Sequence, residues 1–175
     1  MKNVLFILSF FAFSLNGIGQ TKITAEQARS ICAQQMAAFT KAVAPSYQKG
    51  QTYEQFRFTL MGKAQPTVEG ANQLKAAYNF LLQGVSNEFI ITNYKGLEIA
   101  RSMKYLSDLH DKGIDSDGSE LFGGKTGAEN SFAKSGDGGC KWYQFWCLMQ
   151  EVANWVVNNW QTISQIIIII IQVLP

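Results

Sequence analysis

Residues 140–175 read CKWYQFWCLMQEVANWVVNNWQTISQIIIIIIQVLP, and this stretch decides how the rest of the chain is interpreted. It holds all four tryptophans of the protein, and its only charged residues are Lys141 and Glu151. Polar side chains recur at helical steps of three, four or seven, at Gln144, Glu151, Asn154, Asn158, Gln161, Gln165 and Gln172. The spacing predicts a long helix with one narrow polar stripe on an otherwise apolar surface.

The apolar surface of this helix is typical of a segment that contacts a membrane. Tryptophan prefers the bilayer interface and isoleucine the hydrocarbon, and amide side chains form hydrogen bonds between neighbouring helices. We therefore expect contact with membrane lipid or a membrane protein, and self-association through the polar stripe. The residues predicted to contact the membrane are Trp142, Trp146, Trp155, Trp160, Ile163, Ile166, Ile167 and Ile170.

Two other interpretations of the same stretch stay open. A core helix, around which the earlier helices wrap, shows the same periodicity. The six consecutive isoleucines at 166–171 also suit a β-aggregating segment. Length favours the membrane, because a helix of thirty-odd residues is about 50 Å long, which exceeds the width of a bundle of about 90 residues.

Residues 113–139, just before this stretch, are predicted to be a flexible linker. They contain eight of the fifteen glycines of the chain and few large apolar side chains. Such a composition does not offset the entropy that ordering would cost. The segment is acidic, and it ends in Gly138-Gly139, which is a candidate processing site.

Residues 20–112 are predicted to form a bundle of three or four helices. Helix starts are indicated by Thr24 with Gln27 and by Thr52 with Gln55, both with capping-box spacing. A third helix follows Pro66 and ends at Gly84, and a fourth runs from about residue 86 to 110 with an interruption at Gly96. A strand competes only at residues 88–94, EFIITNY.

Residues 1–19 match a secretory signal peptide. Lys2 precedes an apolar run at 4–15, and Gly17 and Gly19 supply the small residues that cleavage before Gln20 requires. We expect export from a bacterial cytoplasm, with the mature protein secreted or periplasmic.

Three cysteines remain after the predicted cleavage. Cys140 and Cys147 form a candidate disulfide pair, but two turns of regular helix place their Cα atoms about 10 Å apart, beyond the reach of a disulfide. The bond would require the helix to begin after Cys140. Three separate small apolar residues, with Cys32 as the third, are the alternative.

No catalytic, cofactor or metal site is predicted. The formal net charge of +2 does not indicate a nucleic-acid-binding protein. Gly124-Lys125-Thr126 lacks the earlier glycine of a phosphate-binding loop, and the segment 115–118, DSDG, lacks the flanking ligands of a calcium loop. The single histidine, His110, stands near a helix end without a nucleophile at suitable spacing. We therefore expect a protein that is not an enzyme.

The order of these segments resembles that of precursors of secreted bacteriocin-like peptides, and the resemblance is one of arrangement. It implies a signal peptide (1–19), a helical domain (20–112), a Gly-rich acidic linker (113–139) and a C-terminal segment (140–175) that acts on or in membranes, with cleavage after Gly139. The alternative is a periplasmic helical binding or interaction module in which the last helix belongs to the core or docks on a partner.

Overall fold

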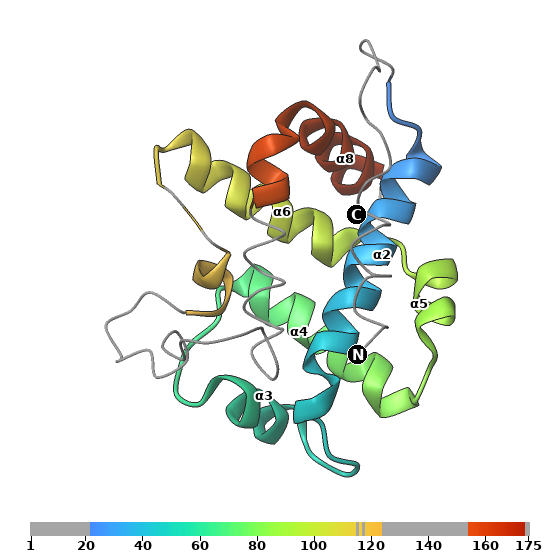
Figure 1. Cartoon of the computed structure of the whole chain (residues 1–175), viewed down its shortest axis with the longest axis vertical. Helices are drawn as coiled ribbons and strands as arrows, with labels where there is room; N and C mark the ends of the chain where they lie inside the picture. The colour runs from blue at the N-terminus through green and yellow to red at the C-terminus, as the bar shows by residue number, and fades with distance from the viewer. Residues whose placement is uncertain (1–21, 115, 117, 124–153, 174–175) are drawn as a thin grey trace, which may run out of the picture.

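The chain folds into a bundle of helices, and the predicted fold class is confirmed. A computed structural model describes residues 22–114, 116, 118–123 and 154–173, and these ranges contain no strand (Figure 1). Residues 154–158 are helical. The other elements are α2 (Ala25–Val43), η1 (Ala44–Ser46), α3 (Tyr53–Met61), α4 (Val68–Gln83), α5 (Asn87–Asn93), α6 (Leu97–Asp111), η2 (Ser119–Phe122) and α8 (Trp160–Val173).

The first helices begin where their capping residues predict. The Thr24 hydroxyl accepts a hydrogen bond from the Gln27 amide at 3.1 Å, and the Gln27 side chain accepts one from the Thr24 amide at 2.8 Å. Thr52 and Gln55 repeat this reciprocal arrangement at the start of α3. Both capping boxes are confirmed, because each depends only on residues within one helical turn.

The predicted fourth helix is two helices, α5 and α6. The backbone of Tyr94 is extended, and Gly96 has φ +101°, a conformation that residues with a Cβ rarely adopt. The chain therefore turns sharply between the two helices. The competing interpretation of residues 88–94 as a strand is wrong, since α5 covers most of that segment.

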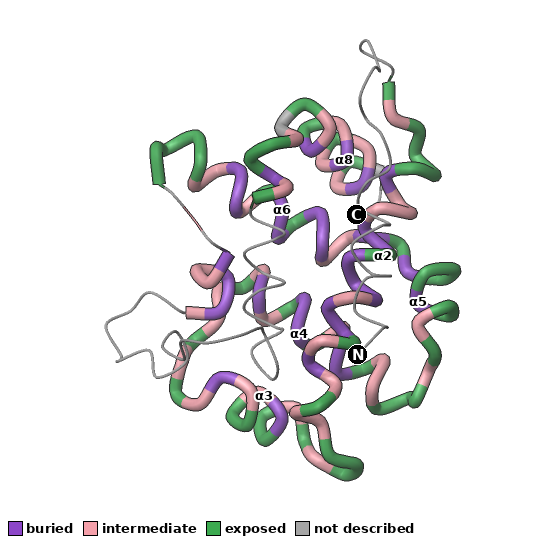
Figure 2. The backbone as a smooth tube through the Cα atoms, in the orientation of Figure 1, coloured by how far each residue is buried: buried purple, intermediate pink, exposed green. Residues whose placement is uncertain are grey.

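Helix α2 lies at the centre of the bundle and packs against α4, α5, α6 and α8 (Figures 1 and 2). Its apolar side chains are buried along nearly its whole length. The fully buried side chains Met36 and Phe39 from α2, Leu74 from α4 and Met103 from α6 contribute to one continuous core. The bundle is therefore organised around its first described helix.

Part of the predicted linker belongs to the core. Leu121 and Phe122 of η2 are buried, and the Phe122 ring stacks on Phe39 with their centroids 5.7 Å apart. The prediction of a flexible linker from residue 113 onward is therefore wrong for residues 119–123. Because residues 113–139 are rich in glycine, their composition did not indicate that one short apolar pair, Leu121-Phe122, packs in the core. Residues 124–139 lie outside the described ranges.

The C-terminal stretch is not one unbroken helix. A turn at Asn159 separates the helical residues 154–158 from α8, which is 14 residues long. The Asn159 side chain donates a hydrogen bond to the Trp155 carbonyl at 2.9 Å. The Asn159 amide also donates to the Trp155 carbonyl, at 3.0 Å. The side-chain bond therefore shares its acceptor with the backbone, an arrangement that bends helices.

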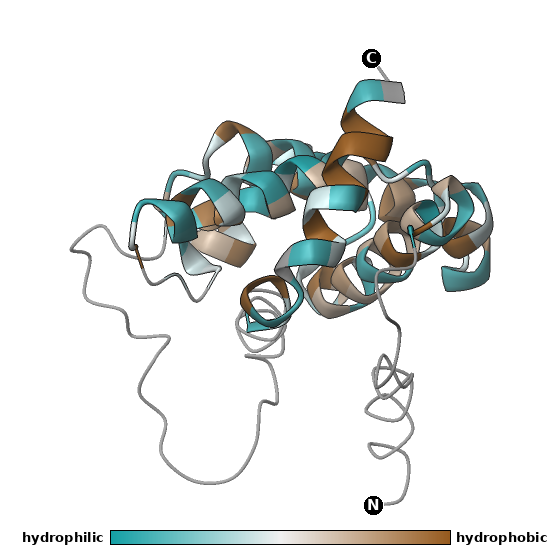
Figure 3. Cartoon of the chain, turned by 90° about the horizontal axis from the view of Figure 1, so that it is seen from above, coloured by the Kyte–Doolittle hydropathy of each residue, from teal (hydrophilic) through white to brown (hydrophobic). Residues whose placement is uncertain are grey.

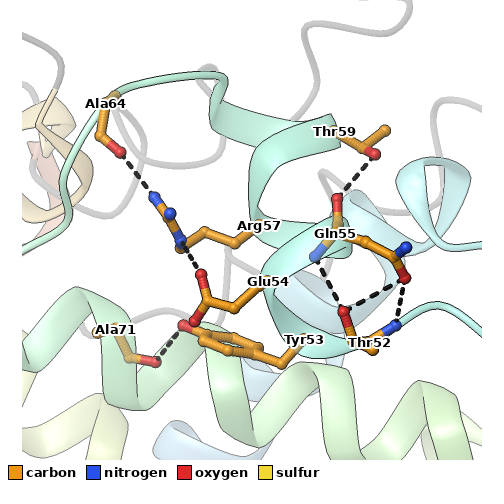
Figure 4. A network of polar contacts seen from close by, with 8 residues as sticks. All are labelled: Thr52, Tyr53, Glu54, Gln55, Arg57, Thr59, Ala64 and Ala71. Atoms are coloured by element: carbon orange, nitrogen blue, oxygen red, sulfur yellow. Dashed lines mark hydrogen bonds and ion pairs between the residues drawn. The ribbon is translucent and has the colours of Figure 1, made fainter.

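Short-range polar contacts hold α3 against its neighbours (Figure 4). The Tyr53 hydroxyl donates to the Ala71 carbonyl on α4 at 3.2 Å. Arg57 pairs with Glu54 at 3.0 Å and donates to the Ala64 carbonyl at 3.1 Å, which fixes the loop after the helix. This helix is therefore tied to α4 at one side and to its own following loop at the other.

One buried side chain of α4, Gln73, lowers the free energy of unfolding. Gln73 is 2 % exposed, and its Oε1 has no hydrogen-bond partner among the described residues. A buried acceptor without a partner costs about 1–3 kcal/mol, and leucine forms helices as well as glutamine does. We expect Gln73→Leu to raise the free energy of unfolding, measured in urea, by about 1 kcal/mol. The control Gln83→Leu, at an exposed position of the same helix, should change it by less than about 0.5 kcal/mol. A loss of stability in Gln73→Leu would contradict this account of the site.

Candidate functional site

The C-terminal helix α8 packs between α2 and α6, in a position that we call the seat of α8. Its side chains Ile163 and Ile166 are 0 % exposed and Ile170 is 4 % exposed, and Val156 just before the helix is 1 % exposed. At the N-terminal edge of the seat, the Ile23 amide donates to Gln165 Oε1 at 2.7 Å. Segments about 140 residues apart in the sequence are thereby joined.

Gly96 lies where the turn between α5 and α6 meets α2 and α8. A Cβ at position 96 would lie 2.8 Å from the Cys32 Cβ and 3.7 Å from the Ile170 Cδ1. The turn between α5 and α6 therefore approaches α2 more closely than a residue with a side chain allows, whereas the distance to α8 is that of an ordinary contact. Burial raises the pKa of the Cys32 thiol to about 12, so this thiol stays protonated and unreactive at neutral pH.

The predicted membrane-contact residues are divided by this packing. Ile163, Ile166 and Ile170 are buried in the protein core, and Trp155 and Ile167 are half-buried against it. The helix is the most apolar segment in view in Figure 3 and carries no charged residue. Trp160 is the first residue of α8. Trp142 and Trp146 lie outside the described residues.

The predicted polar stripe lies on the opposite side of the C-terminal segment. Gln165 is half-buried at the contact with Ile23. The other described members are exposed: Asn154, Asn158, Gln161 and Gln172. Gln144 and Glu151 lie outside the described residues, as do Cys140, Cys147, Gly138 and Gly139. The stripe thus faces solvent while the apolar side packs on α2 and α6.

A second feature was not predicted from the sequence. A cavity of 490 Å³ lies where α4, the end of α5 and the start of α6 meet, and we call it the cationic groove. Its lining residues are Asn72, Lys75, Ala76, Asn79, Phe80, Asn93, Tyr94, Lys95, Glu98 and Arg101. They are spread over about 30 residues with no local motif, and only the α4–α6 packing brings them together.

Two further cavities among the described residues show no chemically active cluster. A surface depression of 620 Å³ follows the loop before α3, and a smaller one of 270 Å³ lies beside His110 and Asn154. His110 is exposed near the end of α6. In the part of the chain that the structure describes, no three His, Cys, Asp or Glu side chains are grouped to hold a metal ion. Within the same ranges, no helix combines the length and apolar character needed to cross a bilayer.

Comparisons with protein-family models, with curated proteins and with solved structures found no match to this chain. The candidate sites are therefore characterised by their own geometry alone: the seat of α8 and the cationic groove.

Proposed function

We propose that this protein is an exported, non-enzymatic helical binding module whose C-terminal helix completes its core. The observation that carries the proposal is the burial of Ile163, Ile166 and Ile170 between α2 and α6. Each such side chain contributes about 1.5–3 kcal/mol when it leaves water. A helix that supplies three of them is a structural element of the bundle.

Export is supported by residues 1–19, whose charge, apolar run and small residues match a secretory signal. Binding is supported by the cationic groove, a cavity at which cationic, amide, carboxylate and aromatic side chains from α4, α5, α6 and the turn between α5 and α6 converge. The helices hold these side chains on rigid elements, as a binding site requires.

A second candidate function is action of the C-terminal segment on a membrane, as in the bacteriocin-like arrangement. One observation favours it: α8 has no charged residue, and Ile168 on its outer side is 54 % exposed. In that case α8 would stay packed in the bundle until it dissociated from α2 and α6, and lipid would then replace its contacts with these two helices. The two candidates differ in whether α8 leaves the protein.

Native-state hydrogen exchange distinguishes them. We expect the amides of α8 in the mature chain to be as protected as those of α6, because both helices bury side chains in one core. Vesicles of anionic phospholipid, loaded with a dye, should leave this protection unchanged when they are added, and they should not release their dye. Fast exchange in α8 without lipid would contradict the core role. Dye release on adding vesicles, with faster exchange in α2 and α6 as α8 leaves them, would instead establish membrane action, because α8 itself stays hydrogen-bonded and protected in lipid.

A further inference from the structure

The cationic groove collects charge from three separate elements. Lys75 comes from α4, Lys95 from the turn between α5 and α6, and Arg101 from α6. All three side chains are exposed, and none forms an ion pair with a residue that the structure describes. Their positive charges therefore line one cavity without a directly paired carboxylate among the described residues.

The single carboxylate that lines the groove, Glu98, offsets only one of the three positive charges. Glu98 Oε2 accepts a hydrogen bond of 2.8 Å from the Tyr94 hydroxyl, which ties Glu98 to the turn. The same hydroxyl accepts a hydrogen bond from the Ile99 amide at 3.1 Å. Burial, and next to it the charge of Glu98, raises the pKa of Tyr94, so its hydroxyl stays a neutral donor. Three cations thus face one engaged carboxylate.

The floor of the groove is apolar and fixed in place. The rings of Phe80 and Tyr94 meet edge to face with their centroids 6.1 Å apart. From α2, Arg29 donates hydrogen bonds to the carbonyls of Ile91, Thr92 and Tyr94 at 3.2–3.3 Å. These bonds hold the end of α5, which carries Asn93, and the turn that carries Lys95 against α2. The groove is therefore preformed.

Amide side chains complete the lining. Asn72 and Asn79 lie on α4 with Lys75 and Ala76 between them, at spacings that share one helix face. Asn93 faces the cavity from the end of α5. Each amide carries both donors and an acceptor, and Asn93 already uses its amide nitrogen to donate to the Phe89 carbonyl at 2.9 Å. Oxygen atoms of a bound group would therefore find neutral hydrogen-bond partners, chiefly Asn72 and Asn79, as well as cations.

We propose that the cationic groove binds a phosphate monoester whose ester group is small and apolar or aromatic. A phosphate monoester carries about −1.5 to −2 charges at neutral pH, which suits three cations opposed by one carboxylate better than a single carboxyl group does. The Arg101 guanidinium matches two phosphate oxygens at once, while the two lysines act as point charges. The ester group would lie on Phe80 and Ala76. The inference rests on the proposed function in treating the chain as a binding module.

The test is calorimetric titration of the mature chain with phenyl phosphate at about 0.1 M salt, where charges more than about 10 Å away are largely screened. We expect a dissociation constant below about 1 mM, weaker binding of inorganic phosphate because it lacks the ring, and weaker binding of benzoate because it has a single charge. Arg101→Glu and, on a different helix, Lys75→Glu should each weaken binding of phenyl phosphate at least about ten-fold, by reversing one charge at the site. The matched control Lys63→Glu makes the same charge change at an exposed position outside the groove and should weaken it less than about two-fold.

Vesicles distinguish the two sources of such a group. If the phosphate belongs to a lipid, the mature chain should bind vesicles that contain phosphatidic acid and should not bind vesicles of phosphatidylcholine alone. Phenyl phosphate should then displace the chain from the phosphatidic acid vesicles. If the ligand is a free ester, phenyl phosphate binds and the vesicles do not. Both results require the binding to be lost in Arg101→Glu.

Absence of phenyl phosphate binding up to about 10 mM, or an equal loss of binding in Lys63→Glu and Arg101→Glu, would overturn the proposal. Circular dichroism of each variant establishes that it folds, and the two groove variants on α4 and α6 guard against misfolding of either one. Failure here with α8 still protected from hydrogen exchange leaves the module standing without this ligand. Failure of that protection would contradict the module itself.

Discussion

Replacing Ile166 by alanine should lower the free energy of unfolding by about 2–5 kcal/mol. Ile166 is fully buried in the seat between α2 and α6, so the truncation removes apolar contacts and leaves a space that the surrounding helices fill only in part. A loss of this size is a large share of the stability of a small domain. Urea unfolding followed by circular dichroism measures it.

Ile168 supplies the matched control, two residues further along the same helix and with the same side chain. It is 54 % exposed, and alanine favours helix slightly more than isoleucine does. Ile168→Ala should therefore change the free energy of unfolding by less than about 0.5 kcal/mol. Equal effects of the two substitutions would show that α8 is not seated as described, because a free helix does not distinguish its two faces.

Gly70→Ala should be the other severe substitution, with a loss of about 2–3 kcal/mol or more. A Cβ at position 70 would lie 2.0 Å from the Leu121 carbonyl oxygen, a backbone atom that cannot move alone. That oxygen accepts hydrogen bonds from the amide of Thr67 at 2.9 Å and from its hydroxyl at 3.1 Å, at the start of α4. The new methyl group would push η2 off α4 and break both bonds.

Helix propensity alone predicts the opposite effect of Gly70→Ala, a rise in the free energy of unfolding. Alanine stabilises a helix interior by about 1 kcal/mol relative to glycine, so Gly70→Ala would stabilise α4 if residues 119–123 were not packed on it. The control Val68→Ala, at an exposed position two residues earlier, should have an effect below about 0.5 kcal/mol. A stabilised Gly70→Ala protein in thermal unfolding would contradict the docking of η2.

Several starts and stops of the helices were determined by the sequence alone. Thr24 with Gln27 and Thr52 with Gln55 form the capping boxes that their spacing predicts, and Gly84 ends α4 in the left-handed conformation. These signals were readable because each depends on hydrogen bonds or backbone angles within one turn of helix. The amphipathic pattern of the C-terminal segment was readable for the same reason, since its polar stripe follows from the helical period.

Only the tertiary structure decided what each apolar helix face packs against. An apolar helix face gains similar free energy against protein side chains and lipid chains, so the pattern of Ile163, Ile166 and Ile170 did not distinguish a core from a membrane. The burial of Leu121 and Phe122 depends on a contact with Gly70 some 50 residues earlier in the chain. The cationic groove depends on the packing of α4 against α6, which brings Lys75 near Arg101. Local sequence fixes which side of a helix is apolar, and long-range packing selects what that side meets.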